Sequence, residues 1–298
     1  MILDPLYKVF WRKMVKSSDE KRMVKQSLPA GIVAINDIPY VDDGKQEHLL
    51  DIYYPENATG KLPVVIDFHG GGFMYAYKEL NKNYCYHIAQ RGFAVINVSY
   101  AIAPENRYPV FILDAMKALK WIGEHIGDYD FLDKDKVFLT GDSAGGMLAA
   151  NAVLVATSDE LQKVYGVEPI DLDIKAIGLT SGMLYYDIGL PKILCPGIFG
   201  KGGIKKSKYK DYLPFENIID KGKFPPTYQV TSEEDMVHDA PLKFKQLLDE
   251  KGIENEIDDF GKVEERKLEH VFSVLYPSEY PESVLTIDHM TQFFLKHI

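Results

Sequence analysis

The first residues that could do chemistry lie in the stretch GDSAGG at Gly141–Gly146, directly after the apolar run KVFLT. A serine between two glycines, placed where a strand should meet a helix, has the pattern of a nucleophile elbow. Such a corner strains the serine backbone and lifts its hydroxyl to a helix N-terminus, where developing negative charge is stabilised. The same pentapeptide also occurs in ordinary loops. Ser143 is therefore a candidate nucleophile that needs a base, an acid and an oxyanion hole elsewhere in the chain.

A second chemical motif, HGGGF at His69–Phe73, follows the apolar run VVIDF. Consecutive glycines can aim several backbone N–H groups into one small space, as the oxyanion of an acyl-transfer intermediate requires. The sequence HGGG is a known oxyanion motif of lipases and esterases, and a merely flexible turn is the alternative. We expect the N–H groups of Gly71, Gly72 and Ala144 to form the oxyanion hole. We expect His69 to be structural, because it precedes the serine in the chain.

The order of HGGGF and GDSAGG resembles the hormone-sensitive-lipase-like branch of the α/β-hydrolases, which includes many microbial carboxylesterases. The segments LDIYYP and YAIAPENRYP are also similar to that branch, so the resemblance runs from about Asp51 to the end of the chain. The family commonly has Arg and Leu where this chain has Ala101 and Ile102. The resemblance implies hydrolysis of carboxylic esters, mostly with short acyl chains.

The family order of the catalytic residues is serine, then an acid, then histidine. After the apolar run PPTYQV, the family pattern of two aspartates separated by three residues matches Asp235 and Asp239, which implies that Asp235 is the catalytic acid. We expect Asp239 to cap the following helix. Glu233 and Glu234 are the rival acids.

The resemblance implies His270, in the segment LEHVFSV, as the catalytic base. The family usually has His-Gly-Phe at this point, whereas here Val271 replaces the glycine and Phe272 is retained. The departure can alter the loop backbone but leaves the imidazole in place. The competing histidines are His238 in the acid loop and His289 and His297 in the expected terminal helix.

These parts predict a serine hydrolase in which His270 takes the proton of Ser143 and Asp235 orients the imidazole, with no metal and no cofactor. An amidase, an arylformamidase or a carbohydrate deacetylase could use the same triad, because the machinery recognises an acyl carbonyl and not the leaving group. A small-molecule receptor on the same fold is the non-enzymatic alternative. That reading requires the base to be absent or misplaced, so the presence of His270 argues against it.

Bulky side chains beside the motifs are candidates for the walls of a substrate pocket and would favour small acyl groups. They are Phe73, Met147, Met183, Tyr185 and Tyr186. Each of them could equally belong to the core.

Apolar runs and amphipathic stretches alternate along the chain, which is typical of a mainly parallel sheet covered by helices on both faces. Strands are expected at 32–41, 48–55, 62–70, 93–100, 136–140, 174–182, 225–235 and 253–262, and helices at 80–92, 109–126, 147–156, 241–252 and 282–298. The turn DDGKQ predicts that the first two strands form a hairpin. The family resemblance implies that this sheet has the α/β-hydrolase fold, as one domain over residues 1–298 with about eight strands.

Two segments fall outside this alternation and are expected to form a small cap, at about 1–30 and 183–224. The first has apolar residues at helical spacing with Arg12, Lys13 and Lys16 on the other face. A membrane-surface helix is the alternative for it. The second shows no clean period, and so long an irregular insertion is usually a functional lid or loop.

Composition limits the partners of the chain. Its 298 residues carry a formal charge of −10, which argues against nucleic acid, and we expect a small-molecule ester as the partner. Cys85 and Cys195 have no metal-ligand spacing and are expected to be free thiols. No signal peptide and no membrane anchor are apparent, so a cytoplasmic protein is expected. A homodimer is conceivable, because edge strands of this fold can pair between subunits.

Overall fold

An eight-stranded sheet forms the centre of the computed structural model, which describes Arg12, Lys16, Asp19, Met23 and residues 26–188 and 190–298. The spatial order of the strands is β1-β2-β4-β3-β5-β6-β7-β8. Their bounds are β1 Ile32–Pro39, β2 Leu49–Pro55, β3 Leu62–Phe68, β4 Ala94–Val98, β5 Leu132–Asp142, β6 Ile174–Thr180, β7 Thr227–Ser232 and β8 Asn255–Phe260. The predicted α/β-hydrolase fold with about eight strands is confirmed.

The sheet is antiparallel at one edge and parallel elsewhere. β1 pairs with β2 and β2 with β4 in the antiparallel sense, and every pair from β4 and β3 through to β7 and β8 is parallel. The carboxyl ends of the six parallel strands therefore meet at one edge, which is where loops of such sheets carry binding and catalytic residues.

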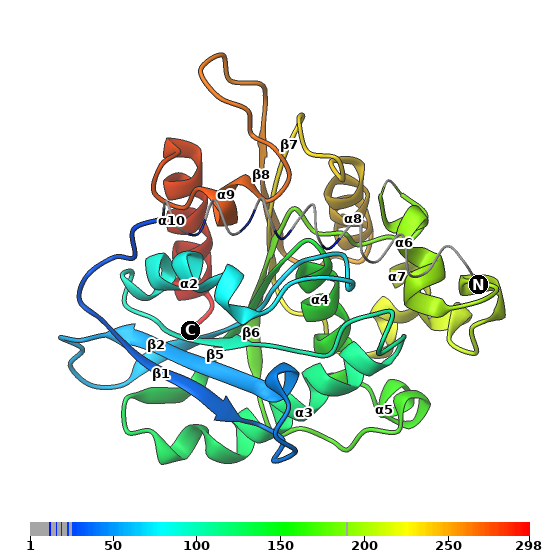
Figure 1. Ribbon diagram of the computed structural model, residues 1–298, viewed down its shortest axis with the longest axis horizontal. Helices are drawn as coiled ribbons and strands as arrows, with labels where there is room; N and C mark the ends of the chain where they lie inside the picture. The colour runs from blue at the N-terminus through cyan, green and yellow to red at the C-terminus, as the bar shows by residue number, and fades with distance from the viewer. Residues whose placement is uncertain (1–11, 13–15, 17–18, 20–22, 24–25, 189) are drawn as a thin grey trace.

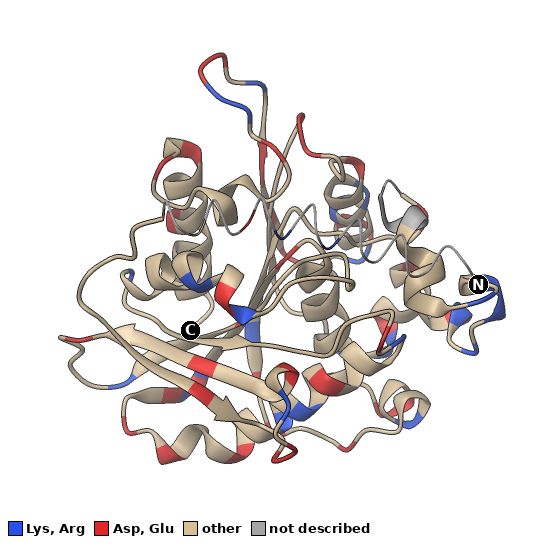
Figure 2. Cartoon of the chain, in the orientation of Figure 1, with Lys and Arg blue, Asp and Glu red and all other residues tan. Residues whose placement is uncertain are grey.

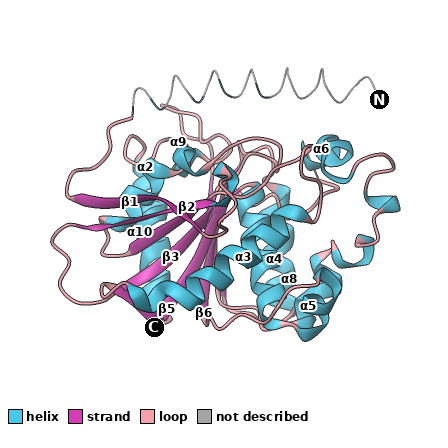
Figure 3. Ribbon diagram, turned by 60° about the horizontal axis from the view of Figure 1, so that its bottom comes forward, coloured by secondary structure: helices cyan, strands magenta, loops and turns pink. Residues whose placement is uncertain are grey.

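Helices cover both faces of the sheet (Figures 1 and 3). The α-helices are α2 Lys82–Ala89, α3 Val110–His125, α4 Ala144–Thr157, α5 Asp159–Tyr165, α6 Leu190–Phe199, α7 Phe215–Ile218, α8 Asp239–Glu250, α9 Phe272–Leu275 and α10 Pro281–Lys296. Short 3-10 turns lie at η1 Gln46–His48, η2 Lys78–Leu80, η3 Ile126–Asp128, η4 Ile204–Lys206, η5 Lys210–Tyr212 and η6 Ile219–Lys221.

Alternation along β3 shows how the strands join the two layers. Val64, Ile66 and Phe68 face a cluster that also contains buried side chains of α3, α4 and α8. Val65, between them, faces the cluster that contains α2, α9 and α10. Because successive side chains of a strand point to opposite faces, one continuous apolar run is buried on both sides.

The insertion of residues 183–224 differs from its prediction, because it is largely built of short helices. It contains α6, α7, η4, η5 and η6, separated by turns. Pro196 lies inside α6, and Gly200, Gly202 and Gly203 all have positive φ angles directly after it. Prolines and glycines at these places break the apolar period that sequence analysis relies on, so the helical content was hidden.

The predicted helix at the start of the chain lies largely outside the described residues. Of its basic face, Arg12 and Lys16 are described, and the placement of Lys13 is not. Within the described part of the chain, no helix combines the length and the apolar character needed to cross a membrane.

Candidate active site

Ser143 occupies the single residue between β5 and α4, with a φ of 51° and a ψ of −115°. A positive φ is unfavourable for serine, and three backbone hydrogen bonds hold it there. The Ser143 N–H donates to Thr180 at 2.9 Å, and its carbonyl accepts from Met183 at 2.9 Å and Met147 at 3.3 Å. The corner has no room for side chains: a Cβ on Gly145 would lie 1.9 Å from the carbonyl oxygen of Phe68.

The imidazole of His270 connects the serine to the acid. His270 Nε2 lies 2.8 Å from Ser143 Oγ, and His270 Nδ1 lies 2.7 Å from Asp235 Oδ1. His270 follows β8 and Asp235 follows β7, so both reach the serine from loops at the carboxyl edge of the sheet. The structure thus brings the three predicted residues into one chain of hydrogen bonds.

Asp235 is the most buried member of the three, with a side chain only 1% exposed. Burial raises the pKa of Asp235, but hydrogen bonding to His270 and its charge, with help from the Ser181 hydroxyl and the Val237 N–H, keep that pKa below its usual range. The Val237 N–H donates to Asp235 Oδ1 at 2.9 Å. The carboxylate is therefore charged and fixed in direction at neutral pH.

The rival candidates for the catalytic acid and base interact with other groups. Glu234 accepts a hydrogen bond from the Leu268 N–H at 3.0 Å, and Glu233 is exposed. His238 contacts Asp259 and His289 contacts Asp258, each at 2.9 Å. His297 Nδ1 lies 2.8 Å from the carbonyl oxygen of Phe293.

The predicted N-cap role of Asp239 is wrong. Helix α8 begins at Asp239 itself, and His238 holds the N-cap position without a side-chain hydrogen bond. An acidic residue in the first helical turn still interacts favourably with the helix dipole, which explains its place there.

Val271, which replaces the glycine usual in the family, adopts the left-handed conformation with a φ of 55° and a ψ of 32°. This conformation is rare for a β-branched residue. The Val271 N–H donates to Ser181 Oγ at 3.0 Å, and the Val271 carbonyl accepts from the N–H groups of Val274 and Leu275. These bonds retain the glycine-type backbone, so the substitution leaves His270 in place at a cost in strain.

The HGGGF loop runs from the end of β3 towards η2. Gly71 and Gly72 have φ angles of 100° and 61°, and a Cβ on Gly71 would lie 2.1 Å from the carbonyl oxygen of Tyr75. Within the described residues, the N–H groups of Gly71 and Gly72 donate to no other protein group. Ala144 is the first residue of α4, where a helical N–H has no partner inside the helix. These three donors are available to a ligand.

His69 and Tyr100 brace the start of this loop. His69 is fully buried, and its ring stacks on that of Tyr100 with centroids 4.2 Å apart. The Tyr100 hydroxyl donates to the carbonyl oxygen of His69 at 2.5 Å. Burial lowers the pKa of His69 to about 4, so the ring is neutral at pH 7. These contacts fit the structural role expected for His69.

A buried network that the sequence analysis missed ties the HGGGF loop to the nucleophile corner. Asp142 Oδ1 accepts hydrogen bonds from the Gly70 N–H and from Asn81 Nδ2, both at 2.8 Å. Asn81 Nδ2 also donates to Asp67 Oδ2 at 2.9 Å. Burial, followed by the charge of Asp142, raises the pKa of Asp67 to about 8, and burial also raises the pKa of Asp142. In the sequence, the sign of this network is Asp67, an aspartate within the apolar run VVIDF.

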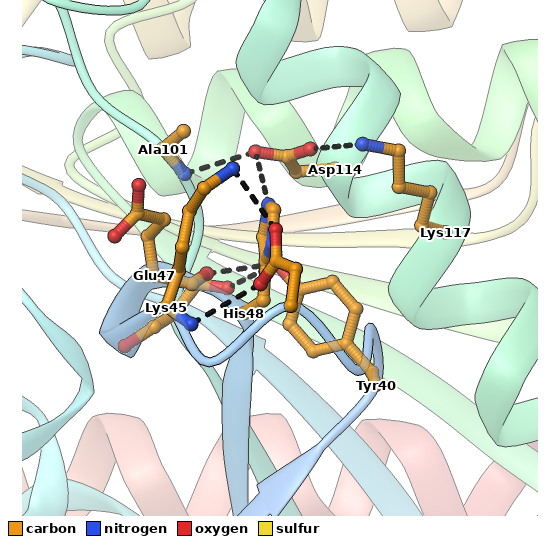
Figure 4. A network of polar contacts seen from close by, with 9 residues as sticks. Tyr40, Lys45, Glu47, His48, Ala101, Asp114 and Lys117 are labelled. Atoms are coloured by element: carbon orange, nitrogen blue, oxygen red, sulfur yellow. Dashed lines mark hydrogen bonds and ion pairs between the residues drawn. The ribbon is translucent and has the colours of Figure 1, made fainter.

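A second polar network, centred on the buried side chains of His48 and Asp114, supports the loop that contains Ala101 and Ala103 (Figure 4). His48 lies between two carboxylates, 2.8 Å from Asp43 through Nδ1 and 3.4 Å from Asp114 through Nε2. Asp114 also accepts from the Ala101 N–H at 3.1 Å and from Lys117 Nζ at 2.8 Å. Two residues further on, the Ala103 N–H donates to the carbonyl oxygen of Phe73 at 2.7 Å. Ala101 differs from the arginine usual in the family, yet its loop stays hydrogen-bonded to residues 69–74, which we call the oxyanion segment.

The five candidate pocket residues are all buried, with exposed fractions between 0% and 7%. Phe73 lies in the core, where its ring stacks on Phe111 at a centroid distance of 4.0 Å, which favours the core alternative for this residue. Tyr185 carries Lys243 Nζ 3.7 Å above its ring, and Tyr186 packs edge-on against Phe199. Met147 and Met183 each donate a backbone hydrogen bond to Ser143.

Both parts of the expected cap contact the oxyanion segment. Arg12 donates to the carbonyl oxygens of Met74 and Ala103, each at 3.0 Å, and pairs with Glu105. Leu194, in the insertion, packs against Gly72. A Cβ added to Gly72 would lie 2.5 Å from Leu194 Cδ1.

Both cysteines lie within the described part of the chain. Cys85 and Cys195 are free thiols. Among the residues that the structure describes, no group of three His, Cys, Asp or Glu side chains is placed to hold a metal ion.

A family model described as alpha/beta hydrolase fold matches residues 65–189. Esterase LipQ of Mycobacterium tuberculosis is 32% identical over 188 residues, which is 59% of this chain and 42% of LipQ. Versiconal hemiacetal acetate esterase of Dothistroma septosporum is 27% identical over 254 residues, covering 81% of this chain and 75% of that protein. This chain thus spans less than half of LipQ and three quarters of the second relative.

Solved structures extend the likeness to nearly the whole chain. Esterase B from Lactobacillus rhamnosis superposes with a TM-score of 0.87 at 26% identity, covering 95% of this chain and 91% of that one.

Proposed function

We propose that this chain is a serine esterase of the hormone-sensitive-lipase-like branch of the α/β-hydrolases, and that it hydrolyses carboxylic esters of short acyl chains. The observation that carries the proposal is the chain of hydrogen bonds from Ser143 through His270 to Asp235. The Ser143–His270 and His270–Asp235 distances are both below 3 Å. A receptor on this fold would not need that alignment.

The reaction follows from the proposed roles. Ser143 Oγ attacks the ester carbonyl carbon while His270 Nε2 takes the hydroxyl proton, and Asp235 stabilises the imidazolium that forms. The carbonyl oxygen gains the negative charge and is held by the N–H groups of Gly71, Gly72 and Ala144. His270 then returns the proton to the leaving alcohol, and an acyl-serine remains. Water, deprotonated by the same imidazole, cleaves that acyl-enzyme and restores Ser143.

The short-chain preference rests on the relatives and on the buried bulk near the serine. One relative is named as an acetate esterase, and one structure of Esterase B is described as inhibited by a C4-C4 tributyrin phosphonate. Met147 and Met183, both 1% exposed, are bonded to Ser143 through their backbones, so two bulky residues lie beside the serine. The cytoplasmic placement and the homodimer stay predictions.

The test combines a substrate series with a covalent probe. We expect p-nitrophenyl acetate and butyrate to be cleaved faster than decanoate, and a fluorophosphonate to label Ser143. The Ser143→Ala variant should keep its circular dichroism spectrum, lose labelling and lose about 10⁴-fold or more in kcat. If the Ser143→Ala variant kept its activity, Ser143 would not be the nucleophile. Faster cleavage of a formyl-amide or an acetylated sugar than of every p-nitrophenyl ester would favour the amidase, arylformamidase or carbohydrate deacetylase alternatives.

A further inference from the structure

A basic turn interrupts the otherwise acidic chain within the insertion. Five lysines occur in ten residues, all with exposed side chains: Lys201, Lys205, Lys206, Lys208 and Lys210. No Asp or Glu occurs from residue 188 to residue 210, although the chain as a whole has a formal charge of −10. We call residues 201–210 the lysine turn. In Figure 2 its blue segments gather at the right edge of the molecule.

Among the described residues, no carboxylate pairs with the lysines of this turn. None of its five lysines takes part in an ion pair among the residues that the structure describes, whereas Lys221 pairs with Glu160 and Lys251 with Asp220. Lys208 Nζ lies over the ring of Tyr209, 4.7 Å from the centroid. The acidic residue that follows directly, Asp211, is also exposed, and it is a single charge against five.

The lysine turn is joined to the candidate active site by one helix. It follows α6 directly, and α6 packs on the oxyanion segment, because a Cβ on Gly197 would lie 2.6 Å from Met74 Cε. Phe199, Ile204 and Tyr212, which flank or lie within the turn, are only partly buried. Lysines beside partly exposed apolar side chains on one rim match the charge and polarity of a lipid headgroup layer.

We propose that the lysine turn docks this protein reversibly on an anionic lipid surface. Clusters of four to eight basic residues bind anionic bilayers, and each lysine near the surface strengthens partitioning about fivefold. A bilayer is a plane that one rim of the protein can meet while the acidic remainder stays in solution. A nucleic acid would extend across that remainder and be repelled. The proposal concerns binding alone and does not depend on ester hydrolysis.

The experiment is co-sedimentation of the full chain with vesicles at low and at high salt. The probes are vesicles of phosphatidylcholine alone and vesicles with about a third phosphatidylglycerol. The test variant carries K201Q, K205Q, K206Q and K208Q. The matched control carries K61Q, K134Q, K262Q and K267Q, which removes the same charge from exposed lysines outside the turn. Circular dichroism and cleavage of p-nitrophenyl acetate verify that both variants are folded.

We expect the wild-type protein to sediment only with the anionic vesicles and to be released by about 0.5 M salt. The test variant should bind them at least tenfold more weakly, and the control should bind like the wild type. Equal binding by the test variant, equal weakening in the control, or no binding by the wild type at low salt would overturn the proposal. So would a single-stranded polynucleotide that binds the turn more tightly than the vesicles do. A Ser143→Ala variant should still bind, so failure of the proposed catalysis and failure of docking are separable.

Discussion

The Nε2 atom of His270 lies 2.8 Å from the Oγ atom of Ser143, although 127 residues separate the two along the chain. The two residues meet because β5 and β8 both end at the carboxyl edge of one parallel sheet. The hydroxyl proton therefore has an acceptor before any substrate binds, and the geometry already matches that needed for general-base catalysis.

Acid pH should inhibit the proposed ester hydrolysis through this contact. A protonated imidazole cannot take the proton of Ser143, so kcat/KM should fall about tenfold per pH unit on the acid side. The measurement is a pH–rate profile with p-nitrophenyl butyrate from pH 8 to pH 4, at temperatures where the protein stays folded. A His238→Asn variant, altered in the histidine that contacts Asp259, should show the same profile. A profile that stays flat to pH 4 would contradict the role of His270.

Replacing Asp235 by Asn should lower kcat about 10⁴-fold, because the amide favours the wrong tautomer of His270 and cannot stabilise the imidazolium. The control is Asp239→Asn, an exposed aspartate four residues later, which should change kcat less than twofold. Kinetics and a thermal melt of both variants make the comparison. Equal losses in the two would show that the loop, and not the carboxylate of Asp235, matters.

The Asn81→Asp substitution should disturb the oxyanion segment without touching substrate. Asn81 Nδ2 donates to Asp67 and to Asp142, and Asp142 in turn holds the Gly70 N–H. A third carboxyl at this place removes the donor and adds repulsion, which should cost about 2 kcal/mol of stability.

Because the oxyanion donors act mainly in the transition state, we expect Asn81→Asp to lower kcat about tenfold with KM nearly unchanged. Steady-state kinetics on p-nitrophenyl butyrate and urea unfolding measure the two effects, and Asn217→Asp at an exposed position is the control. A variant with normal kcat and reduced stability would limit Asn81 to a structural role.

The raised pKa of Asp67 predicts how stability depends on pH. In the folded state this carboxyl holds its proton up to about pH 8, whereas in the unfolded chain it ionises near pH 4. Between these values the unfolded state binds fewer protons, so this group lowers stability as pH rises.

Asp67→Asn removes that contribution and can still accept the hydrogen bond of Asn81. We expect the fall in Tm between pH 5 and pH 8 to be smaller by a few degrees in the variant than in the wild type. Scanning calorimetry at several pH values measures this, with the exposed Asp130→Asn as the control. An unchanged pH dependence in Asp67→Asn would show that Asp67 ionises normally in the folded protein.

Local patterns were enough for the fold and for the candidate residues. The alternation of apolar runs and amphipathic helices predicted the parallel sheet, because burial on both faces requires continuous apolar strands. The glycines of HGGGF and GDSAGG were recognisable for a similar reason, since each motif needs backbone conformations or close approaches that other residues cannot adopt.

Tertiary structure alone decided what surrounds those residues. Asn81 reaches Asp142 across 61 positions, and Gly70 reaches it across 72, and no periodicity links positions so far apart. The burial of Phe73 against Phe111 and the left-handed backbone of Val271 likewise depend on neighbours from other elements. A pattern in the chain records the backbone and the burial that each segment needs, whereas the partner of a buried polar group is set only when the segments pack.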